Sequence, residues 1–285
     1  MTLALRSVEL PGGPLLQYVE QGDRSGTPLV LLHGFTDSWR SFELVLAHLP
    51  PELRAIAVTQ RGHGDAGRPA DGYRPRDLAA DVAQLMDLLG IASAVLVGHS
   101  MGASVALRFA LDHPERTLGV ALLGALGCWQ RNPAVMELRA AVSAFEDPVD
   151  PAFVREFQAA TISQPVPPGL LDTMVQESLK VPARVWRAIC EGFWHDDPAA
   201  DPGGVRAPTL IIWGDADPFC PRRAQEDLLR AIARSRLVVY QDAGHAMHWE
   251  QPARVAADLA RFAHSLPPRT MPRAAPATAD APAPV

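Results

Sequence analysis

Basic residues are scarce in this sequence, and lysine occurs only once, as Lys180. The 26 Lys and Arg residues are outnumbered by 32 Asp and Glu residues, so the formal net charge is -6. Without a basic field or a run of Lys and Arg, little in the chain would attract phosphates. We therefore expect no nucleic-acid partner.

Long apolar runs are also missing. No segment reaches the roughly 18 apolar residues that cross a bilayer. The opening residues, MTLALRSVELPGGPLLQYVEQGD, lack the basic stretch followed by an apolar stretch that marks a secretory signal. From these two features we expect no membrane partner and a cytoplasmic location.

Cysteine is rare. Cys128, Cys190 and Cys220 are odd in number and widely spaced, which fits neither a disulfide framework nor a zinc knuckle. Free, buried thiols are the expected state. Hydrophobic residues make up 48% of the chain and charged residues 20%, a balance typical of a globular protein with a substantial core.

Short apolar runs rich in β-branched residues alternate with stretches of helical period. Most of the runs lack polar alternation, as expected for strands buried on both faces of a parallel sheet. The helical stretch 75–90 has a leucine-rich stripe and ends with Gly90 in the position of a C-cap. This alternation predicts right-handed crossovers and a doubly wound, mostly parallel α/β sheet. The runs span 28–34, 53–60, 93–100, 118–125, 208–215 and 236–242, and the helical stretches span 75–90, 101–114, 221–235 and 252–266.

The interval 126–205 breaks this alternation, because it holds several proline-punctuated helical segments and no legible buried strand. An insertion of that size between two strands favours a helical lid over a loop. Its aromatic side chains, with Trp129, Trp186 and Trp194 among them, either pack the lid itself or line a substrate pocket. The predicted organisation is a core over 1–125 and 206–266, a lid over 126–205, and a disordered Pro- and Ala-rich tail over 267–285.

The sequence GHSMG at 98–102 lies where a buried run meets a helical one, which is the context of a G-x-S-x-G nucleophile elbow. A residue at the tip of so tight a turn has a strained backbone, and its neighbours two before and two after must be small. Gly98 and Gly102 meet that need. We expect the Ser100 hydroxyl to project from the carboxyl edge of the sheet as a nucleophile.

A serine hydroxyl needs a base to remove its proton and a carboxylate to orient that base. WGDADPFCP follows one buried run and offers Asp215 and Asp217; DAGHAMHWEQP follows the next run and offers His245 and His248. The order Ser, Asp, His is that of one of three serine-hydrolase architectures.

The two histidines three residues apart also raise the alternative of a metal site. A third ligand and an H-E-x-x-H helix are missing from this stretch, and Glu250 is better explained by a helix that begins at Pro252. We expect no metal and no organic cofactor.

Two backbone amides are candidates for binding an oxyanion. The amide of Met101 opens the helix after Ser100, and the amide of Phe35 lies in LLHGFTDSW, the loop after an earlier strand. His33 in this loop has two interpretations, a buried hydrogen-bonding residue or a catalytic one, and we favour the first. Trp39, at the end of the same stretch, is a pocket candidate.

Four motifs in order resemble those of the α/β-hydrolase fold family. They are HGF at 33–35, RGHG at 61–64, GHSMG at 98–102, and the pair GDADPFCP with GHAMHWEQP. The chain is similar to the single-domain lidded members related to bacterial esterases, lactonases, epoxide hydrolases and cofactor-free haloperoxidases, over residues 15 to 265. The resemblance implies a doubly wound α/β fold with a helical lid inserted after the sixth strand.

The resemblance also implies site residues. Ser100 aligns with the family nucleophile, and Asp217 fits the acid of the pattern G-x-x-D-x-x-x-P, so Asp217 is implied rather than Asp215. His245 fits the base of G-H-x-x-x-x-E-x-P. The amides of Phe35 and Met101 inherit the oxyanion hole.

The expected reaction is hydrolysis of a small apolar carboxylic ester or lactone through an acyl-enzyme. Epoxide hydrolases, which the HGFTDSW loop resembles, carry aspartate where Ser100 stands, and serine cannot form their alkyl-ester intermediate. The same triad is also compatible with carbon–carbon bond hydrolysis, acyl transfer or peracid formation, and a non-catalytic ligand-binding scaffold is a further alternative. His248 is expected beside Trp249 or at the pocket rim.

Overall fold

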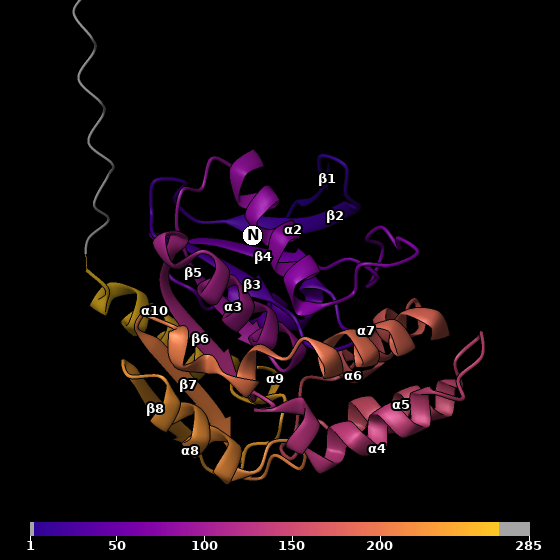
Figure 1. Cartoon of the computed structure of the whole chain (residues 1–285). Coiled ribbons are helices and arrows are strands. Elements are labelled where there is room, and N and C mark those ends of the chain that lie inside the picture. The colour runs from indigo at the N-terminus through magenta and orange to yellow at the C-terminus, as the bar shows by residue number, and fades with distance from the viewer. Residues whose placement is uncertain (1–2, 268–285) are drawn as a thin grey trace, which may run out of the picture.

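The computed structural model describes residues 3–267. These residues form an eight-stranded sheet in the order β1-β2-β4-β3-β5-β6-β7-β8 (Figure 1). Strands β3 to β8 are parallel to one another, whereas β2 pairs antiparallel with both β1 and β4. The predicted mostly parallel sheet is therefore confirmed. The strands are β1 (Leu5–Glu9), β2 (Leu15–Gln21), β3 (Pro28–Leu32), β4 (Arg54–Thr59), β5 (Ala94–His99), β6 (Thr117–Leu123), β7 (Thr209–Gly214) and β8 (Ser235–Tyr240).

Strands β1 and β2 are additions to the six buried runs recognised in the sequence. Strand β1 is largely exposed and β2 is only partly buried, because they form the antiparallel edge of the sheet. An edge strand that faces water does not need a continuous apolar run. The predicted tail, apart from Pro267, lies outside the described residues.

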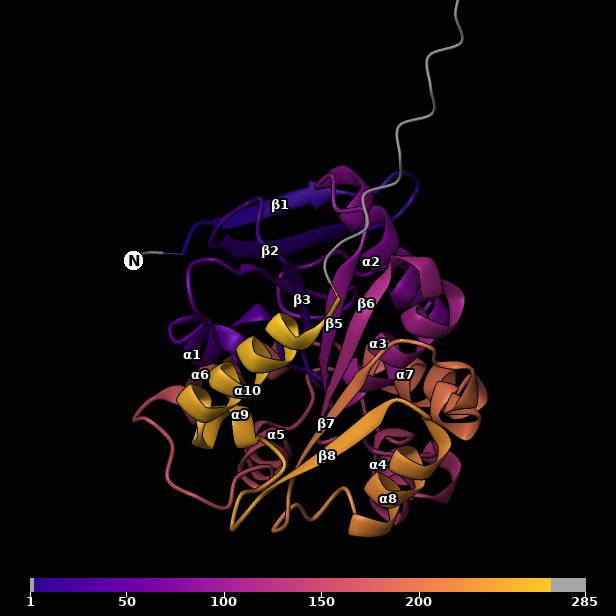
Figure 2. The ribbon, with the colours of Figure 1, turned by 90° about the vertical axis from the view of Figure 1, so that its left-hand side faces the viewer.

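Helices cover both faces of the sheet, as Figure 2 shows for α1 and α10 on one side and α2 and α3 on the other. The helices are α1 (Glu43–Leu46), α2 (Pro75–Leu88), α3 (Met101–Asp112), α4 (Pro133–Val142), α5 (Pro151–Ala159), α6 (Leu170–Leu179), α7 (Ala183–His195), α8 (Arg222–Ala231), α9 (Met247–Glu250) and α10 (Pro252–Ser265). Short 3-10 helices occupy Trp39–Phe42, Pro114–Arg116, Trp129–Arg131, Pro198–Ala200 and Pro202–Gly204. Among residues 3–267, no helix combines the length and the apolar character needed to span a membrane.

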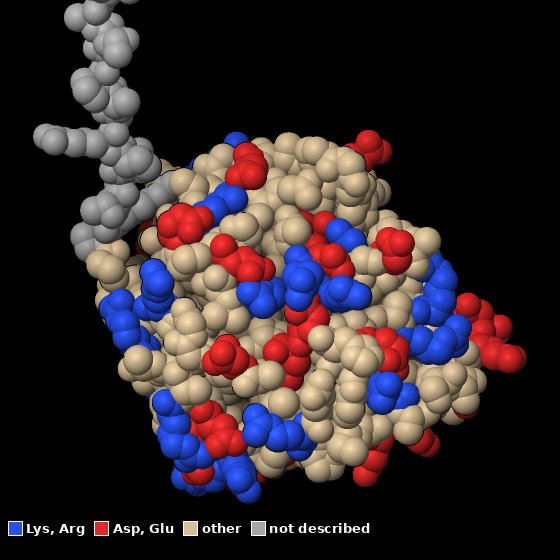
Figure 3. Space-filling model, viewed as in Figure 1, with Lys and Arg blue, Asp and Glu red and all other residues tan. Residues whose placement is uncertain are grey.

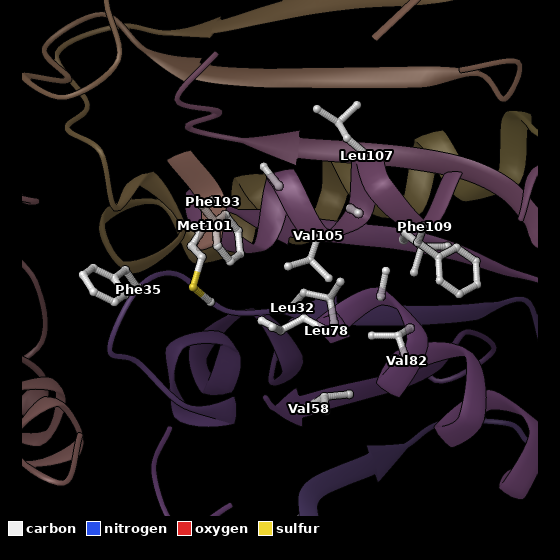
Figure 4. Packing of buried hydrophobic residues seen from close by; sticks show 14 of the residues in the cluster. Leu32, Phe35, Val58, Leu78, Val82, Met101, Val105, Leu107, Phe109 and Phe193 are labelled. Carbon is white, nitrogen blue, oxygen red and sulfur yellow. The ribbon is translucent and has the colours of Figure 1, made fainter. Parts of the chain in front are cut away.

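The two faces of the sheet carry two separate apolar layers, because successive side chains of a strand point to opposite faces. Leu32 of β3 packs with Leu78 of α2 and Val105 of α3 (Figure 4). Its neighbour Leu31 belongs to the other layer, with Leu259 of α10. Both layers are buried, so the central strands read as unbroken apolar runs in the sequence.

The face seen in Figure 3 shows no large field of one charge, because basic and acidic side chains are interspersed there. The single lysine, Lys180, pairs with Asp65 at 2.8 Å and with Glu177 at 2.9 Å. It thereby joins the end of α6 to the loop after β4.

Four helices, α4 to α7, lie between β6 and β7 and form one group in Figure 1. Their insertion after the sixth strand follows the predicted order. The division of the chain into a core and a separate lid at residues 126 and 205 stays a prediction.

Much of the aromatic content of the insertion packs the insertion itself. The Trp186 side chain is fully buried, and its ring centroid lies 4.8 Å from that of Phe35 and 5.6 Å from those of Phe145 and Phe157. The indole Nε1–H donates to the carbonyl of Val181 at 3.1 Å. Aromatic pairs in this geometry stabilise a fold beyond the area they bury.

A carboxylate joins the insertion to the loop after β8. The Glu250 carboxylate accepts hydrogen bonds from the amides of Ser163 at 2.5 Å, Gln164 at 3.1 Å and Gly244 at 2.9 Å. The predicted start of the last helix at Pro252 is confirmed. The side chain of Glu250, two residues before it, has a role that the sequence did not indicate, because it binds the insertion.

Two buried histidines brace the loops that follow β3 and β4. The Nε2 atom of His33 accepts from the amide of Gln60 at 3.0 Å, so Nδ1 carries the hydrogen and donates to Gly34 O at 2.8 Å. The interpretation of His33 as a residue that shapes its loop is confirmed. His63 lies beside it, with ring centroids 4.9 Å apart. Burial lowers the pKa of both imidazoles, that of His63 to about 4.

We expect Glu250→Gln to lower the free energy of unfolding by about 1–3 kcal/mol, because an amide NH2 would face amide donors that the carboxylate now satisfies. Urea unfolding measures the loss. Glu226→Gln is the matched control, because Glu226 forms an exposed ion pair with Arg222 on α8 and such pairs contribute little. A loss for Glu250→Gln no larger than for the control would contradict the joining role.

We expect the free energy of unfolding to fall as the pH drops from about 6.5 to about 4, since the unfolded chain binds protons at His33 and His63 that the folded protein excludes. Each such histidine contributes up to about 1.4 kcal/mol per pH unit in this range. The variant His63→Gln removes one of them, so its unfolding free energy should depend less steeply on pH. Urea unfolding at several pH values tests this, and an unchanged slope would refute it.

Candidate active site

Ser100 lies at the tip of the turn between β5 and α3, with φ 53° and ψ -115°. A β-carbon on Gly98 would lie 2.1 Å from the carbonyl oxygen of Gly102, and one on Gly102 would lie 2.2 Å from the carbonyl oxygen of Leu32. Only glycine fits at either position without a shift of the backbone. The geometry is that of the strained turn expected from GHSMG.

His245 and Asp217 meet across the loops that follow β8 and β7. The Nδ1 atom of His245 lies 2.8 Å from Oδ2 of Asp217. The other carboxylate oxygen, Oδ1, accepts from the amides of Phe219 at 2.8 Å and Cys220 at 3.0 Å. Since a carboxylate can only accept, Nδ1 donates, and Nε2 is left with a lone pair.

Asp215 has a different place. It is exposed, and its Oδ1 accepts from the amide of Asp242 at 2.7 Å. The structure therefore brings His245 together with Asp217, the aspartate that the motif pattern indicates.

Ser100 and His245 line one cavity of about 40 Å³. Its walls are almost entirely apolar and come from α4, α5 and the loops after β3, β6 and β7. Besides Ser100 and His245, the lining residues are Phe35, Leu126, Trp129, Ala134, Val135, Leu138, Phe157, Thr161 and Phe219.

The two amides considered for oxyanion binding lie on elements next to Ser100. Met101 opens α3, and Phe35 follows β3 and lines the cavity. Within residues 3–267, neither amide donates a hydrogen bond to another protein group. For Met101 this is expected, because it is the first residue of a helix. The Met101 side chain itself packs in the core near Phe193 (Figure 4).

Of the tryptophans among the pocket candidates, only Trp129 lines this cavity. Its indole Nε1–H donates to Ser104 Oγ at 3.0 Å. The Arg40 guanidinium lies over the Trp39 ring, 4.8 Å from the centroid of that ring. Trp39 borders a separate groove. Trp194 lies beneath another arginine, and Trp186 lies within the aromatic packing described above. The structure does not bring these three tryptophans to Ser100.

His248 is also outside the cavity lining. Its side chain is fully buried, packed 5.4 Å from Trp249 between ring centroids, with Nε2 2.9 Å from Ser41 Oγ. Burial and the nearby His245 lower the pKa of His248 to about 3. Of the two placements considered for it, the structure shows packing beside Trp249 rather than a position at the rim.

The carboxyl group of Asp37 is buried, and no sequence motif indicated this. It accepts from Ser41 Oγ at 3.0 Å and from Gln158 Nε2 at 3.0 Å. Burial raises the pKa of Asp37 to about 6. Asp37 lies in the HGFTDSW loop, where a polar residue gives no sign that it will be enclosed by α5.

His99 supports His245 from the other side. Its Nε2 donates to the main-chain carbonyl of His245 at 3.1 Å, and the two ring centroids lie 4.8 Å apart. His99 is buried, and burial lowers its pKa well below the usual range, so the ring is neutral. A neutral neighbour does not oppose a positive charge on His245.

The three cysteines are free, as expected, although Cys128 is only half-buried. Cys220 is fully buried, and its Sγ lies 3.6 Å from Nδ1 of His245. Burial and the neighbouring Asp217 raise the pKa of this thiol, which donates to Gly124 O at 3.2 Å. Ligand atoms of Asp217, Cys220 and His245 all lie within 4.8 Å of one another.

The aliphatic residues of the cavity had no signal in the sequence, whereas Trp129 and Phe157 belong to the aromatic residues that were considered for the pocket. Phe219 lies inside the GDADPFCP motif, and the motif could have indicated it. Val135, Leu138 and Phe157 reach the cavity only through the packing of α4 and α5, which no local pattern specifies.

Comparisons with known proteins find relatives that cover most of this chain. The model of the alpha/beta hydrolase family matches residues 29–258. A 2-hydroxymuconate semialdehyde hydrolase from Pseudomonas sp. (strain CF600) is 31% identical, over 84% of this chain and 87% of that protein. A non-heme chloroperoxidase from Streptomyces lividans is 28% identical, over 91% of this chain and 99% of that protein.

Among solved structures, an esterase from Exiguobacterium antarcticum is similar, with a TM-score of 0.81 and 25% identity. The match covers 91% of this chain and 99% of that one. The resemblance stated from four sequence motifs is confirmed by these findings. The strand order, the turn at Ser100 and a family match across most of the chain lead to one conclusion: this chain belongs to the alpha/beta hydrolase family.

Proposed function

We propose that the protein is a serine hydrolase that cleaves a carboxylic ester or lactone through an acyl-enzyme. One arrangement carries this proposal. Ser100, held at a positive φ angle, shares a cavity with His245, and His245 is hydrogen-bonded through Nδ1 to a buried Asp217. This combination supplies a nucleophile, a base and a group that orients the base.

In the first half of the reaction, Nε2 of His245 takes the proton of Ser100 as Oγ attacks the carbonyl carbon. Asp217 holds the imidazole in the Nδ1–H tautomer and stabilises its charged form. The amides of Phe35 and Met101 donate to the oxyanion, and His245 then gives the proton to the leaving alcohol oxygen. Water repeats the sequence on the acyl-enzyme and releases the acid. These steps require no metal or organic cofactor.

The cavity supports an uncharged substrate whose buried part is small. Its volume is about 40 Å³, and no arginine or lysine lines it. An anionic group would therefore lose water there without gaining a counter-ion. Since α4 and α5 form part of the wall, we propose that the insertion acts as a lid that selects the substrate.

A second candidate is hydrolysis of a carbon–carbon bond by the same residues. It is favoured by the similarity to the protein named 2-hydroxymuconate semialdehyde hydrolase. A muconate is a carboxylate, however, and the cavity offers no basic side chain for one. The ester or lactone is therefore the first candidate.

We expect Ser100→Ala and His245→Ala to lower kcat on a neutral aryl ester by at least about 10³-fold each, because each removes one member of the nucleophile and base pair. Steady-state kinetics measure the loss, and a fluorophosphonate probe should label the unaltered protein at Ser100 only. His248→Ala is the control, which should keep most of the turnover while lowering thermal stability. Full turnover by Ser100→Ala would sink the proposal, and absence of labelling would favour a non-catalytic scaffold.

We expect an ester that bears a free carboxylate on its acyl part to react with a kcat/KM at least about 100-fold below that of its methyl-capped analogue, because the unpaired charge would be desolvated. The pair is compared at equal acyl length. Equal rates, or a preference for the carboxylate, would favour the second candidate function instead.

A further inference from the structure

Three kinds of metal-binding atom meet behind the imidazole of His245. Sγ of Cys220 lies 3.6 Å from Nδ1 of His245, and Oδ2 of Asp217 lies 2.8 Å from the same nitrogen. All three side chains are buried. Within residues 3–267, no other group of three such ligands comes this close together. Thiolate, imidazole and carboxylate are the ligands that bind zinc in proteins.

The separation of the sulfur and nitrogen atoms suits a tetrahedral cation. Bonds of about 2.3 Å to sulfur and about 2.0 Å to nitrogen place these two ligands about 3.5 Å apart, close to the 3.6 Å between Sγ and Nδ1. The shorter separation between Nδ1 and Oδ2 is set by the hydrogen between them, so it lengthens by a few tenths of an ångström when a cation replaces that hydrogen.

Gly124 packs directly against this group. A β-carbon there would lie 3.0 Å from Nδ1 of His245, and its backbone has φ 52°. The carbonyl oxygen of Gly124 accepts from Sγ of Cys220 at 3.2 Å, so a backbone oxygen also lies beside the group. His245 and Phe219 also line the cavity at Ser100, so the group lies directly behind the wall of that cavity.

We propose that Asp217, Cys220 and His245 form a binding site for a thiophilic divalent cation, such as Zn²⁺ or Cd²⁺, and that the bound cation inhibits the enzyme. The site rests on the geometry alone. The inhibition rests in addition on the proposed function, because it requires His245 to be the base for Ser100.

Cation binding releases one proton and leaves the group without net charge. The cation forms bonds to Sγ of Cys220, Nδ1 of His245 and one oxygen of Asp217. The thiol proton goes to solvent, and the hydrogen on Nδ1 is replaced by one on Nε2, so the imidazole stays neutral. The two positive charges offset the thiolate and the carboxylate, so the buried group carries no net charge.

Inhibition follows from the tautomer. With Nδ1 bound to the cation, Nε2 carries a hydrogen and has no lone pair to accept the proton of Ser100. Asp217 is at the same time withdrawn from stabilising a charged imidazole. A single cation thereby removes both the base and the group that supports the base.

The test uses Cd²⁺ on the full chain, because a cadmium–thiolate bond has a charge-transfer band in the ultraviolet. We expect one equivalent of Cd²⁺ to produce the band, to raise the melting temperature and to abolish ester turnover. EDTA should reverse all three effects. The band and the melting temperature report the site even if the ester is not the right substrate, so failure of the site and failure of the proposed function are distinguishable.

Cys220→Ser keeps a hydroxyl donor for Gly124 O while removing the thiolate. We expect it to lose the band and to need at least about 100-fold more Cd²⁺ for half inhibition of its own ester turnover, whatever the level of that turnover. Cys220→Ala serves as the second variant if the serine variant does not fold. Cys128→Ser, at the half-buried cysteine, is the matched control and should bind Cd²⁺ as the unaltered protein does.

The proposal is overturned if the unaltered protein shows no band at a few equivalents of Cd²⁺. It is also overturned if the band is lost in Cys128→Ser and kept in the Cys220 variants. Inhibition that persists unchanged without the Cys220 thiol would place the responsible ion at another site.

Discussion

The close approach of α3 to the sheet is the constraint on which the site depends. Gly98 and Gly102 let the helix begin directly against β3 and β5, at distances where a single β-carbon would collide with a backbone carbonyl. Ser100 therefore has a positive φ angle, which for a residue with a side chain is costly and persists only where the surroundings enforce it. The packed central strands and α3 hold Ser100 in this conformation. Burial of the apolar core on both faces of the sheet offsets the free-energy cost of the strained backbone.

Around this turn, His245 is held from two directions. On one side, Asp217 accepts from Nδ1, and the Asp217 carboxylate is in turn fixed by the amides of Phe219 and Cys220. On the other side, the neutral ring of His99 packs against His245 and donates to its main-chain oxygen. Such support from outer residues limits the motion of the imidazole and sets its tautomer. The same Nδ1 then becomes the atom that a cation would take, since Cys220 lies within reach of it.

The sequence predicted the parts of this structure that local spacing determines. GHSMG specifies its own turn, and GDADPFCP and GHAMHWEQP each follow a buried strand, so parallel pairing brings Asp217 and His245 to the same edge of the sheet. The apolar lining was not predictable in this way. Whether a tryptophan lines a cavity or fills a core depends on how helices far apart in the sequence pack. Trp129 lines the cavity, whereas Trp186 packs among other aromatic side chains.

The same reasoning explains why β1, β2 and Asp37 were missed. Strand β1 is largely exposed, β2 is only partly buried, and neither has an unbroken apolar run. Asp37 has the sequence context of a polar loop residue, and it becomes buried only because α5 of the insertion supplies Gln158 to bind it. Burial of a polar side chain by a distant element leaves no mark on the residues next to it.

Hydrogen bonds join the insertion to the loop that carries His245. Glu250 binds the amides of Ser163 and Gln164 on one side and that of Gly244 on the other, and the amide of Ala246 donates to Thr161 O at 2.8 Å. Thr161 itself lines the cavity. A substitution that shifts α5 to enlarge the cavity therefore also moves the backbone next to His245. Changes in substrate size and changes in the position of the base are coupled in this fold, so a wider pocket requires compensation in the residues that Glu250 holds.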